Sequence, residues 1–496
     1  MTISSYGRLE SRFARLSALD DVVGVLHWDM STMMPEGGAR GRAEQLATLK
    51  TLSHELLTAP EVSDLLDRAE ADGAALGAWQ SANLREMRRD WVHAAAVPGD
   101  LVEALSLAVS SCEMTWRAAR PAADFQAVVK PLEEVLNLVR QTAAAKAGRL
   151  GCGLYDALLD QYEPGGRSAA IDRVFADLEA FLPGFLQQVL AHQGPPPERP
   201  SGPFPVGRQR ALGLRLMAIL GFDFSHGRLD VSFHPFCGGS ADDVRITTRY
   251  DEADFTTSLM GVVHETGHAL YDFGLPAAWR RQPVGRARGM SVHESQSLLF
   301  EMQACRSRPF LDFAAPLMRE AFDGVGAAWE AENLHRLYTR VEPGFIRVDA
   351  DEVTYPAHVI LRYRLEKAMI EGDLAVADLP GAWNDGMVAL LGITPPDDGR
   401  GCLQDIHWYD GAWGYFPTYT LGAMTAAQLF DAAVTALPDI PAAIGRGDFA
   451  PLVGWLRDNL HGRASLLGVD DLLTGATGRP LDAAVFKEHL RRRYLA

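Results

Sequence analysis

Two histidines four residues apart, with a glutamate directly after the first, form the sharpest chemical pattern in the sequence. They lie in the motif HETGH, His264 to His268. Residues four apart share one face of a helix, so both imidazoles can reach one metal ion. Glu265 then lies beside the ion, where it can take a proton from a metal-activated water. The pattern predicts a hydrolytic metal centre with Glu265 as its general base.

A hydrolytic zinc site needs a third protein ligand, because three ligands leave the fourth position open for water. The best candidate is Glu294 in the downstream motif HESQS, which we expect on a second helix packed against the first. His293 and Glu301 are the alternatives. We prefer Glu294 because two imidazoles and one carboxylate are a common hydrolytic zinc set. His293 is equally well explained as a partly buried histidine with a satisfied hydrogen bond.

Further segments extend the pattern along the chain and make a family recognisable. The ordered motifs are HPF (His234 to Phe236), DVRIT (Asp243 to Thr247), IRVDAD (Ile346 to Asp351) and GCLQDIHW (Gly401 to Trp408), with LHWDMSTMMPEGG (Leu26 to Gly38) before them and GYFPTY (Gly414 to Tyr419) after them. With HETGH and HESQS, these segments make the chain resemble the thermostable (Taq-type) metallocarboxypeptidase family over nearly its whole length.

This resemblance implies a large helical peptidase fold with a deep active-site groove, related to other helical gluzincins, and a homodimer. It implies a zinc or cobalt ion held by His264, His268 and Glu294. It also implies a carboxypeptidase that releases single C-terminal amino acids from peptides with broad specificity. Two departures, Leu298 where a more polar residue is expected and Ala357 in place of a larger apolar one, bear on specificity rather than on activity.

Two arginines are candidates for binding the free C-terminal carboxylate that a carboxypeptidase must recognise. A guanidinium binds a carboxylate through two parallel hydrogen bonds. Arg245 lies in DVRIT, in an expected strand where it projects opposite Val244 and Ile246. Arg347 lies in IRVDAD. The alternative for each is a structural salt bridge, with Asp243 or Asp349 as the nearby partner.

Candidates for stabilising the developing oxyanion come from a polar, aromatic part of the sequence. His407, Tyr415 and Tyr355, in that order, can each donate a hydrogen bond to the scissile carbonyl oxygen. For the tyrosines, a core ring with a satisfied hydroxyl is the alternative. His234 precedes a proline, and we expect it to shape the groove wall as part of the substrate-binding region rather than to ligate metal.

Two other functions compete with the carboxypeptidase. A helical zinc oligoendopeptidase would use the same metal ligands to cut internally, without a carboxylate clamp. A non-enzymatic interaction protein with a vestigial metal site is the other. The intact residues His264, His268, Glu294 and Glu265 argue against the last, and the DVRIT and IRVDAD motifs favour the carboxypeptidase through the family resemblance.

Apolar spacing predicts that the elements carrying these residues are mainly α-helical. Leu46, Leu49, Leu52 and Leu56 form one stripe. Helices are expected at 41–57, 98–120, 125–149, 168–192, 449–461 and 481–494. Strands are expected only at 228–233, 244–250 and 345–349, which predicts a mainly α fold with a small β-sheet near the zinc site.

A proline-rich segment, GPPPERPSGPFPVG at 194–207, interrupts the helical pattern. We interpret it as a surface loop that joins a helical N-terminal half (1–193) to a metal-site half (208–496), within a single peptidase domain spanning 1–496. The alternative is a linker between two domains.

The overall charge and the cysteines limit the partners. The net charge of −17 disfavours nucleic acid and anionic membrane surfaces. Five scattered cysteines without a CxxC pair fit a reducing compartment rather than a disulfide framework. The N-terminus has no apolar signal region and no run of about 18 apolar residues occurs, so we expect a cytoplasmic protein that acts on peptides with a free C-terminus.

Overall fold

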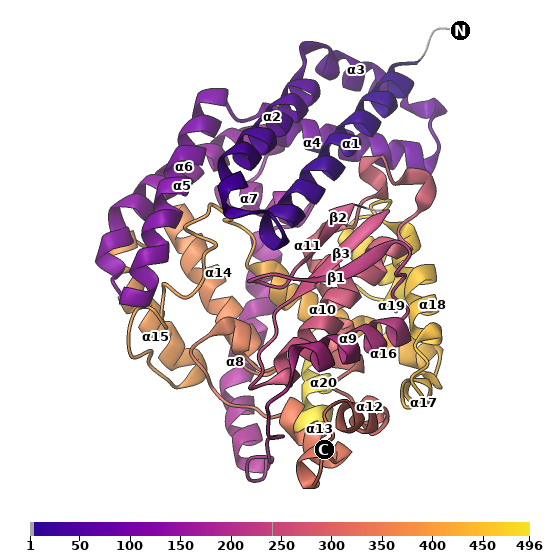
Figure 1. The fold of residues 1–496 in the computed structure, drawn as a ribbon. Helices are drawn as coiled ribbons and strands as arrows, with labels where there is room; N and C mark the ends of the chain where they lie inside the picture. Colours follow the sequence, from indigo (N-terminus) through magenta and orange to yellow (C-terminus); the bar gives the residue numbers. More distant parts are fainter. Residues whose placement is uncertain (1–3, 241) are drawn as a thin grey trace.

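The structure is a computed structural model that describes residues 4–240 and 242–496. Helices make up most of it, and one three-stranded sheet lies near the middle of the molecule (Figure 1). The predicted mainly helical fold with a small sheet is confirmed. No single helix in these ranges is long and apolar enough to span a bilayer, although α4 (Ala78–Ala95) and α5 (Gly99–Ala122), bent by 75°, pass on length and composition as a pair.

Two helices of the first half begin at a side-chain cap. Ser4 accepts a hydrogen bond from the Gly7 N–H at the start of α1, and Asp124 accepts one from Ala127 at the start of α6. The remaining bounds are α1 (Ser5–Thr32), α2 (Ala39–Thr58), α3 (Pro60–Ala71), α6 (Phe125–Leu150), α7 (Leu154–Tyr162), α8 (Ser168–His192) and α9 (Val206–Leu220).

All four helices predicted in this half are confirmed, since they coincide with α2, α5, α6 and α8. The apolar stripe of α2 is only partly buried. Leu46 is in the interior, whereas Leu52 is 47% exposed. The spacing therefore identified the helix but not how far it packs.

The sheet has the strand order β1-β3-β2. β1 (Gly227–Val231) runs parallel to β3 (Asp243–Thr248), and β2 (Cys237–Ser240) runs antiparallel to β3. The strands predicted at 228–233 and 244–250 are thus confirmed as β1 and β3. β2 was not predicted, because its sequence CGGS contains no β-branched or aromatic residue.

The third predicted strand, at 345–349, is wrong. Arg347–Asp349 form a single 3₁₀ turn instead. The backbone N–H of Arg347 donates to the side chain of Gln404 at 2.8 Å, so a side chain takes the place that a neighbouring strand would need. The Phe-Ile-Arg-Val run has strand-forming residues but no partner strand.

The second half supplies the helices around the site. They are α10 (Phe255–Gly274), α11 (Gly289–Leu298), the π-helical turn η5 (Leu299–Ala304), α12 (Arg308–Ala321), α13 (Ala331–Tyr338), α14 (Tyr355–Glu371), α15 (Leu379–Leu391), α16 (Pro417–Ala436), α17 (Ile440–Ile444), α18 (Ala450–Asn459), α19 (Val469–Thr477) and α20 (Ala483–Tyr494). α18 and α20 confirm the helices predicted at 449–461 and 481–494.

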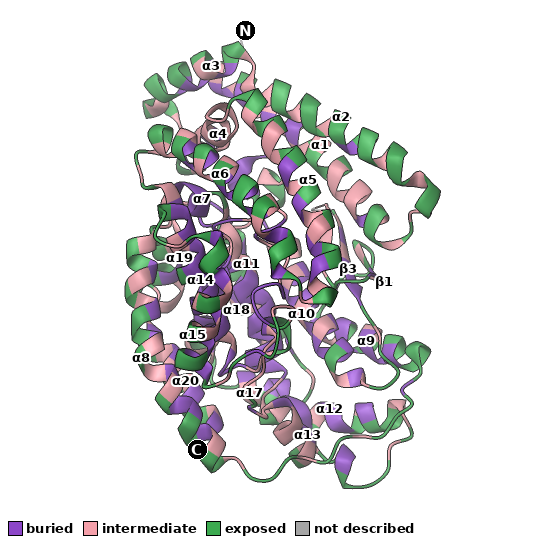
Figure 2. Ribbon diagram, turned by 90° about the vertical axis from the view of Figure 1, so that its left-hand side faces the viewer, coloured by how far each residue is buried: buried purple, intermediate pink, exposed green. Residues whose placement is uncertain are grey.

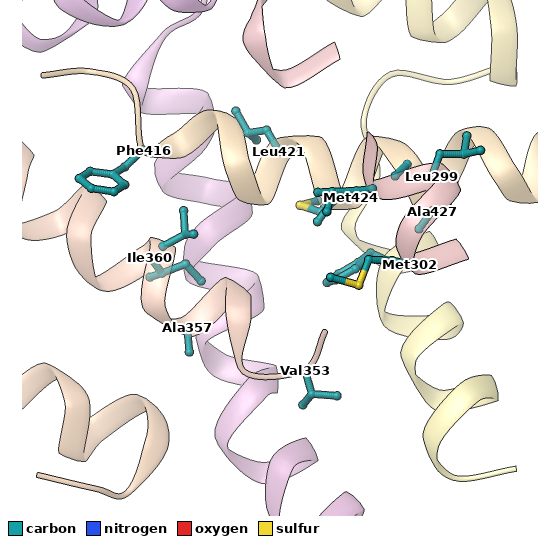
Figure 3. Packing of buried hydrophobic residues seen from close by; sticks show 14 of the residues in the cluster. Leu299, Met302, Val353, Ala357, Ile360, Phe416, Leu421, Met424 and Ala427 are labelled. Carbon is teal, nitrogen blue, oxygen red and sulfur yellow. The ribbon is translucent and has the colours of Figure 1, made fainter. Parts of the chain in front are cut away.

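One large hydrophobic core connects the two halves of the chain. It runs from Ala108 on α5 to Tyr494 on α20, and buried residues gather around α10, α11 and α14 in the middle of the molecule (Figure 2). Figure 3 shows part of this core, where Met424 of α16 lies between η5, which carries Met302, and α14, which carries Ile360. A smaller hydrophobic cluster is formed by buried residues of α1, α3 and α4.

The proline-rich segment has no helix or strand as far as Pro205, and most of its residues are exposed. It is fastened to the region of α13. Arg340 donates to the carbonyl of Gly194 at 2.7 Å, and the N–H of Glu198 donates to Asn333 at 2.9 Å. These contacts hold the connection between α8 and α9 in place.

Candidate metal centre and active site

Helix α10 carries the HETGH motif into the interior. The Asp254 side chain accepts a hydrogen bond from Thr256 and fixes the start of the helix. Apolar residues such as Val263 and Leu270 bury the rest of its surface. His264 and His268 lie one turn apart, with ring centroids 5.1 Å from each other. The helical spacing thus brings both imidazoles to one place.

Gly267 allows α11 to approach α10 closely. A Cβ at this position would lie 2.5 Å from the carbonyl oxygen of Gln296, so any larger residue would force the helices apart. This approach brings Glu294 to the histidines. The Glu294 Oε2 lies 3.6 Å from His268 Nε2, and ligand atoms of His264, His268 and Glu294 all lie within 4.8 Å of one another.

Helix α16 packs against Glu294 from the other side. A Cβ at Gly422 would lie 2.8 Å from both Cβ and Cγ of Glu294. The carboxylate is therefore confined between α10 and α16, with its residue 7% exposed. Two glycines on two different helices thus set the position of one side chain.

The two alternative ligands, Glu301 and His293, contact the opposite nitrogens of the histidines. The His264 Nδ1 lies 2.8 Å from Glu301 Oε2, and the His268 Nδ1 lies 2.7 Å from His293 Nδ1. His293 in turn faces Asp272, with Nε2 3.4 Å from Oδ1. Because Nδ1 of both histidines is engaged in this way, Nε2 is the nitrogen that each imidazole can offer to a metal, and that of His268 lies beside Glu294.

Buried charges around this cluster favour a cation. Burial raises the pKa of Glu265 to about 7, and the charge of Glu294 acts in the same direction. Burial lowers the pKa of His264, but the hydrogen bond to Glu301 and the charges of Glu294 and Glu265 outweigh it and raise the value to about 10. Two imidazoles and one carboxylate are also a donor set that suits zinc. The residues present therefore fit a divalent metal ion.

Arg347 lies close enough to Glu294 for its charge to act on that carboxylate. Burial raises the pKa of Glu294, and the charge of Arg347 is among those that act against this rise. The Arg347 guanidinium donates to Asp405 through Nε at 2.8 Å and Nη2 at 3.1 Å, rather than to Asp349. It also lies 4.6 Å from the ring centre of Tyr419.

The predicted oxyanion donors gather beside Arg347. His407 Nε2 lies 3.2 Å from the hydroxyl of Tyr419, and the Tyr415 ring lies 5.1 Å from the Tyr419 ring. Burial raises the pKa of both Tyr355 and Tyr415, and the negative charge of Glu294 contributes to each rise. These phenols are therefore neutral hydrogen-bond donors close to the metal cluster.

Arg245 and His234 occupy a different setting. Arg245 donates through Nε to both carboxylate oxygens of Asp243 at 3.0 Å and stacks on Trp28 of α1, 4.4 Å from its ring centre. His234 is exposed and packs edge-on against Phe233. The salt-bridge alternative thus describes the geometry of Arg245, and neither residue belongs to the cluster around Glu294.

Several residues of the site escaped the sequence reasoning. Asp272 follows His268 by one helical turn, so the same spacing argument that joined the histidines would have found it. Tyr419 is the second tyrosine of the segment GYFPTY, of which only the first, Tyr415, is predicted as a site residue. Arg362, which lies 2.9 Å from Asp405, carries no local signal, because only the packing of α14 brings it there.

Comparisons with known proteins identify one family over nearly the whole chain. A family model described as carboxypeptidase Taq (M32) metallopeptidase matches residues 8–494. Thermostable carboxypeptidase 1 of Thermus thermophilus is 38% identical over 481 residues, which cover 95% of this chain and 94% of that protein.

Solved structures agree as well. Metallocarboxypeptidase 1 of Trypanosoma cruzi superposes with a TM-score of 0.98 at 40% identity and covers 100% of both chains. The M32 carboxypeptidase of Deinococcus radiodurans superposes with a TM-score of 0.93 at 35% identity, over 99% of this chain and 98% of that one.

Proposed function

The chain belongs to the carboxypeptidase Taq (M32) metallopeptidase family, and from this premise we propose that His264, His268 and Glu294 hold its catalytic metal ion and that Glu265 is its general base. The family makes the chain a peptide-cleaving metallocarboxypeptidase that needs a divalent ion. The observation that carries the residue assignment is the meeting of three ligand atoms within 4.8 Å, with Glu265 adjacent in the same helix.

We propose zinc as the ion, with cobalt as a functional substitute. A bound divalent ion supplies Lewis acidity and lowers the pKa of a water at the site. The two Nε2 atoms and the Glu294 carboxylate would hold it. Glu301 and His293 keep the two imidazoles in the orientation and tautomer that this requires.

Glu265 moves the proton. It is 6% exposed, and its pKa of about 7 without metal would fall once a cation neutralises the surrounding carboxylates. Its carboxylate accepts a proton from the attacking water and delivers it to the leaving amine. The phenols of Tyr355 and Tyr415, with His407 beside them, then donate to the oxygen on which negative charge develops.

Recognition of the free C-terminus falls to Arg347 rather than to Arg245. Arg347 acts electrostatically on Glu294, so a substrate carboxylate bound to it would leave the adjacent peptide bond near the ligands. Arg245 is stacked on Trp28 and paired with Asp243. We therefore assign Arg347 to substrate and Arg245 to the attachment of α1 to the sheet, while His234 borders the groove.

The experiment compares one peptide with a free and with an amidated C-terminus, using enzyme depleted of metal and reloaded with zinc or with cobalt. We expect release of the terminal residue from the acid, little cleavage of the amide, and no cleavage by the depleted enzyme. Internal cleavage of both peptides at similar rates would instead identify an oligoendopeptidase. Activity that persists after complete metal removal would contradict the metal assignment.

A further inference from the structure

A second arginine shares the carboxylate that binds Arg347. Arg362 of α14 places Nη2 2.9 Å from Asp405 Oδ2, the same oxygen that accepts from Arg347 Nε at 2.8 Å. The contact between Arg362 and Asp405 is thus an ion pair that acts through charge. Two guanidinium groups therefore share one carboxylate.

Both arginines are deeply buried. The side chain of Arg362 is 1% exposed and that of Arg347 is 7% exposed. Burial lowers the pKa of Arg362 to about 10, and the charge of Arg347 adds to this effect, so Arg362 is still charged at neutral pH. Its other contacts are neutral: Nη1 donates to the carbonyl of His358 at 3.1 Å, and the guanidinium lies over Trp383.

The charges around Asp405 do not balance. In the described parts of the chain, neither guanidinium has an acidic partner within 4.0 Å other than Asp405. The neighbouring imidazoles are neutral at pH 7, because burial lowers the pKa of His407 to about 4 and that of His358 to about 3. Two positive charges against one negative charge leave a surplus of one.

A buried positive charge without a partner is costly and calls for an anion. The surplus lies at the more accessible of the two arginines, Arg347, which faces Glu294 and the tyrosines. A substrate C-terminus carries one negative charge and would neutralise it. Without Arg362, Asp405 would neutralise Arg347 completely, and this demand for an anion would disappear.

We propose that Arg362 is a positioning residue for substrate specificity: it balances Asp405, so that Arg347 keeps one positive charge in excess for the substrate's terminal carboxylate. The proposal rests on the function assigned to Arg347 above. It predicts that preference for a free C-terminus follows the net charge of the Arg347–Asp405–Arg362 group rather than the presence of Arg347 alone.

A series of variants sets this net charge to different values in the zinc-loaded enzyme. The wild type has +1, R362Q has 0, and R362Q/D405N returns to +1; R362K keeps the charge with a different shape. For each, kcat and KM are measured on matched free-acid and amidated peptides, together with zinc content and the melting temperature.

We expect R362Q to raise KM for the acid peptide by about tenfold or more, the loss typical of one charge-assisted interaction, with kcat nearly unchanged. The amide should be little affected. R362K and R362Q/D405N should restore the acid preference. If R362Q does not fold, the double variant and R362K carry the test, because both must keep the wild-type ratio of acid to amide kcat/KM.

Equal losses on both peptides in R362Q, or failure of R362Q/D405N to retain the acid preference, would overturn the proposal and leave Arg362 a purely structural residue. The variant R347Q distinguishes a wrong role for Arg362 from a wrong role for Arg347 in substrate binding. If R347Q leaves the ratio of acid to amide kcat/KM unchanged, Arg347 does not bind the terminal carboxylate. If R347Q loses the preference while R362Q keeps it, only the role of Arg362 is wrong.

Discussion

At the scale of single residues, the site depends on which of three acidic or imidazole side chains meets His264 and His268. Glu294 lies 3.6 Å from the Nε2 of His268, whereas Glu301 contacts Nδ1 of His264 at 2.8 Å. A residue that orients a ligand through its second nitrogen strengthens metal binding without touching the metal. The two glutamates should therefore differ sharply in what their loss costs.

We predict that Glu294→Ala loses its metal on dialysis, whereas Glu301→Ala retains metal with affinity weakened by about 10–100-fold. Metal content after dialysis and competition with a graded series of chelators measure both. Full occupancy in Glu294→Ala together with loss in Glu301→Ala would mean that the third ligand is Glu301.

A second residue-scale prediction concerns Lys146 on α6, which donates to Gln161 at 2.6 Å. Burial lowers its pKa from 10.5 to about 8, and the charge of Arg89 adds to the shift. The unfolded chain therefore binds more protons between pH 8 and 10.5, so this group makes folding more favourable as the pH rises through that window.

The wild type should accordingly gain stability relative to Lys146→Met from pH 8 to 10.5, by at most about 3.5 kcal/mol, since one pKa unit corresponds to about 1.4 kcal/mol. Denaturant unfolding at several pH values measures this. Lys130→Met, which removes the same charge from an exposed position of α6, is the matched control. A stability difference independent of pH would refute the shift.

Some of these residues were accessible from the sequence and others were not. The spacing in HETGH fixes His264 and His268 on one helical face, because helical geometry alone determines it. The prediction of Glu294 as a ligand also required the assumption that a second helix packs against the first. Asp405 lies in the motif GCLQDIHW, whereas Arg362 lies in no motif, and the two meet only through packing, which no local pattern encodes.

At the scale of elements, the turn behind the metal site is unusual. Leu299–Ala304 form a π-helical turn that carries Glu301, and the last carbonyls of a helical segment lack partners within it. Arg493 of the C-terminal helix α20 supplies them: it donates to the carbonyls of Met302 and Gln303 and to Glu352, the last at 3.0 Å. The end of the chain thereby holds the turn that orients His264.

We predict that Arg493→Met lowers the free energy of unfolding by about 3–5 kcal/mol, as expected when one partner of a buried ion pair is removed, and speeds metal loss to a chelator. Arg492→Met is the control, because Arg492 is exposed and its ion pair in the described part of the chain is with exposed Asp431, so its loss should change stability by less than about 1 kcal/mol. Equal effects of the two substitutions would show that α20 does not support the site.

Elements were predictable where one chain segment contains the whole signal. The amphipathic stripes of α5, α6 and α8 locate those helices to within one or two residues. β2 was not predicted, because its pairing with β3, and not its residues Cys-Gly-Gly-Ser, makes it a strand. The strand predicted at 345–349 was wrong for the opposite reason, since its strand-forming residues have no neighbouring strand to pair with.

At the scale of the whole molecule, helices from both halves share one hydrophobic core that reaches from α5 to α20, and the segment before α9 is fastened to Asn333 and Arg340. These observations support the proposal that the chain forms a single catalytic domain. The family resemblance further leads us to propose a homodimer.

Sedimentation equilibrium tests the assembly. We predict a mass of twice the 54.1 kDa of one chain at micromolar concentration, with or without bound metal, because no metal ligand is assigned to a subunit interface. A mass of one chain under the same conditions would contradict the dimer while leaving the assignment of the active site untouched.

The central claim is that Glu265 transfers the proton at a metal held by its neighbours, and the turnover of metal-loaded Glu265→Gln tests it most directly. The amide keeps the size of the side chain and leaves His264, His268 and Glu294 in place, so metal content should match the wild type. We predict that kcat falls by about 10²–10⁴-fold, as is usual when a general base is removed. Near-normal kcat with metal bound would contradict the account.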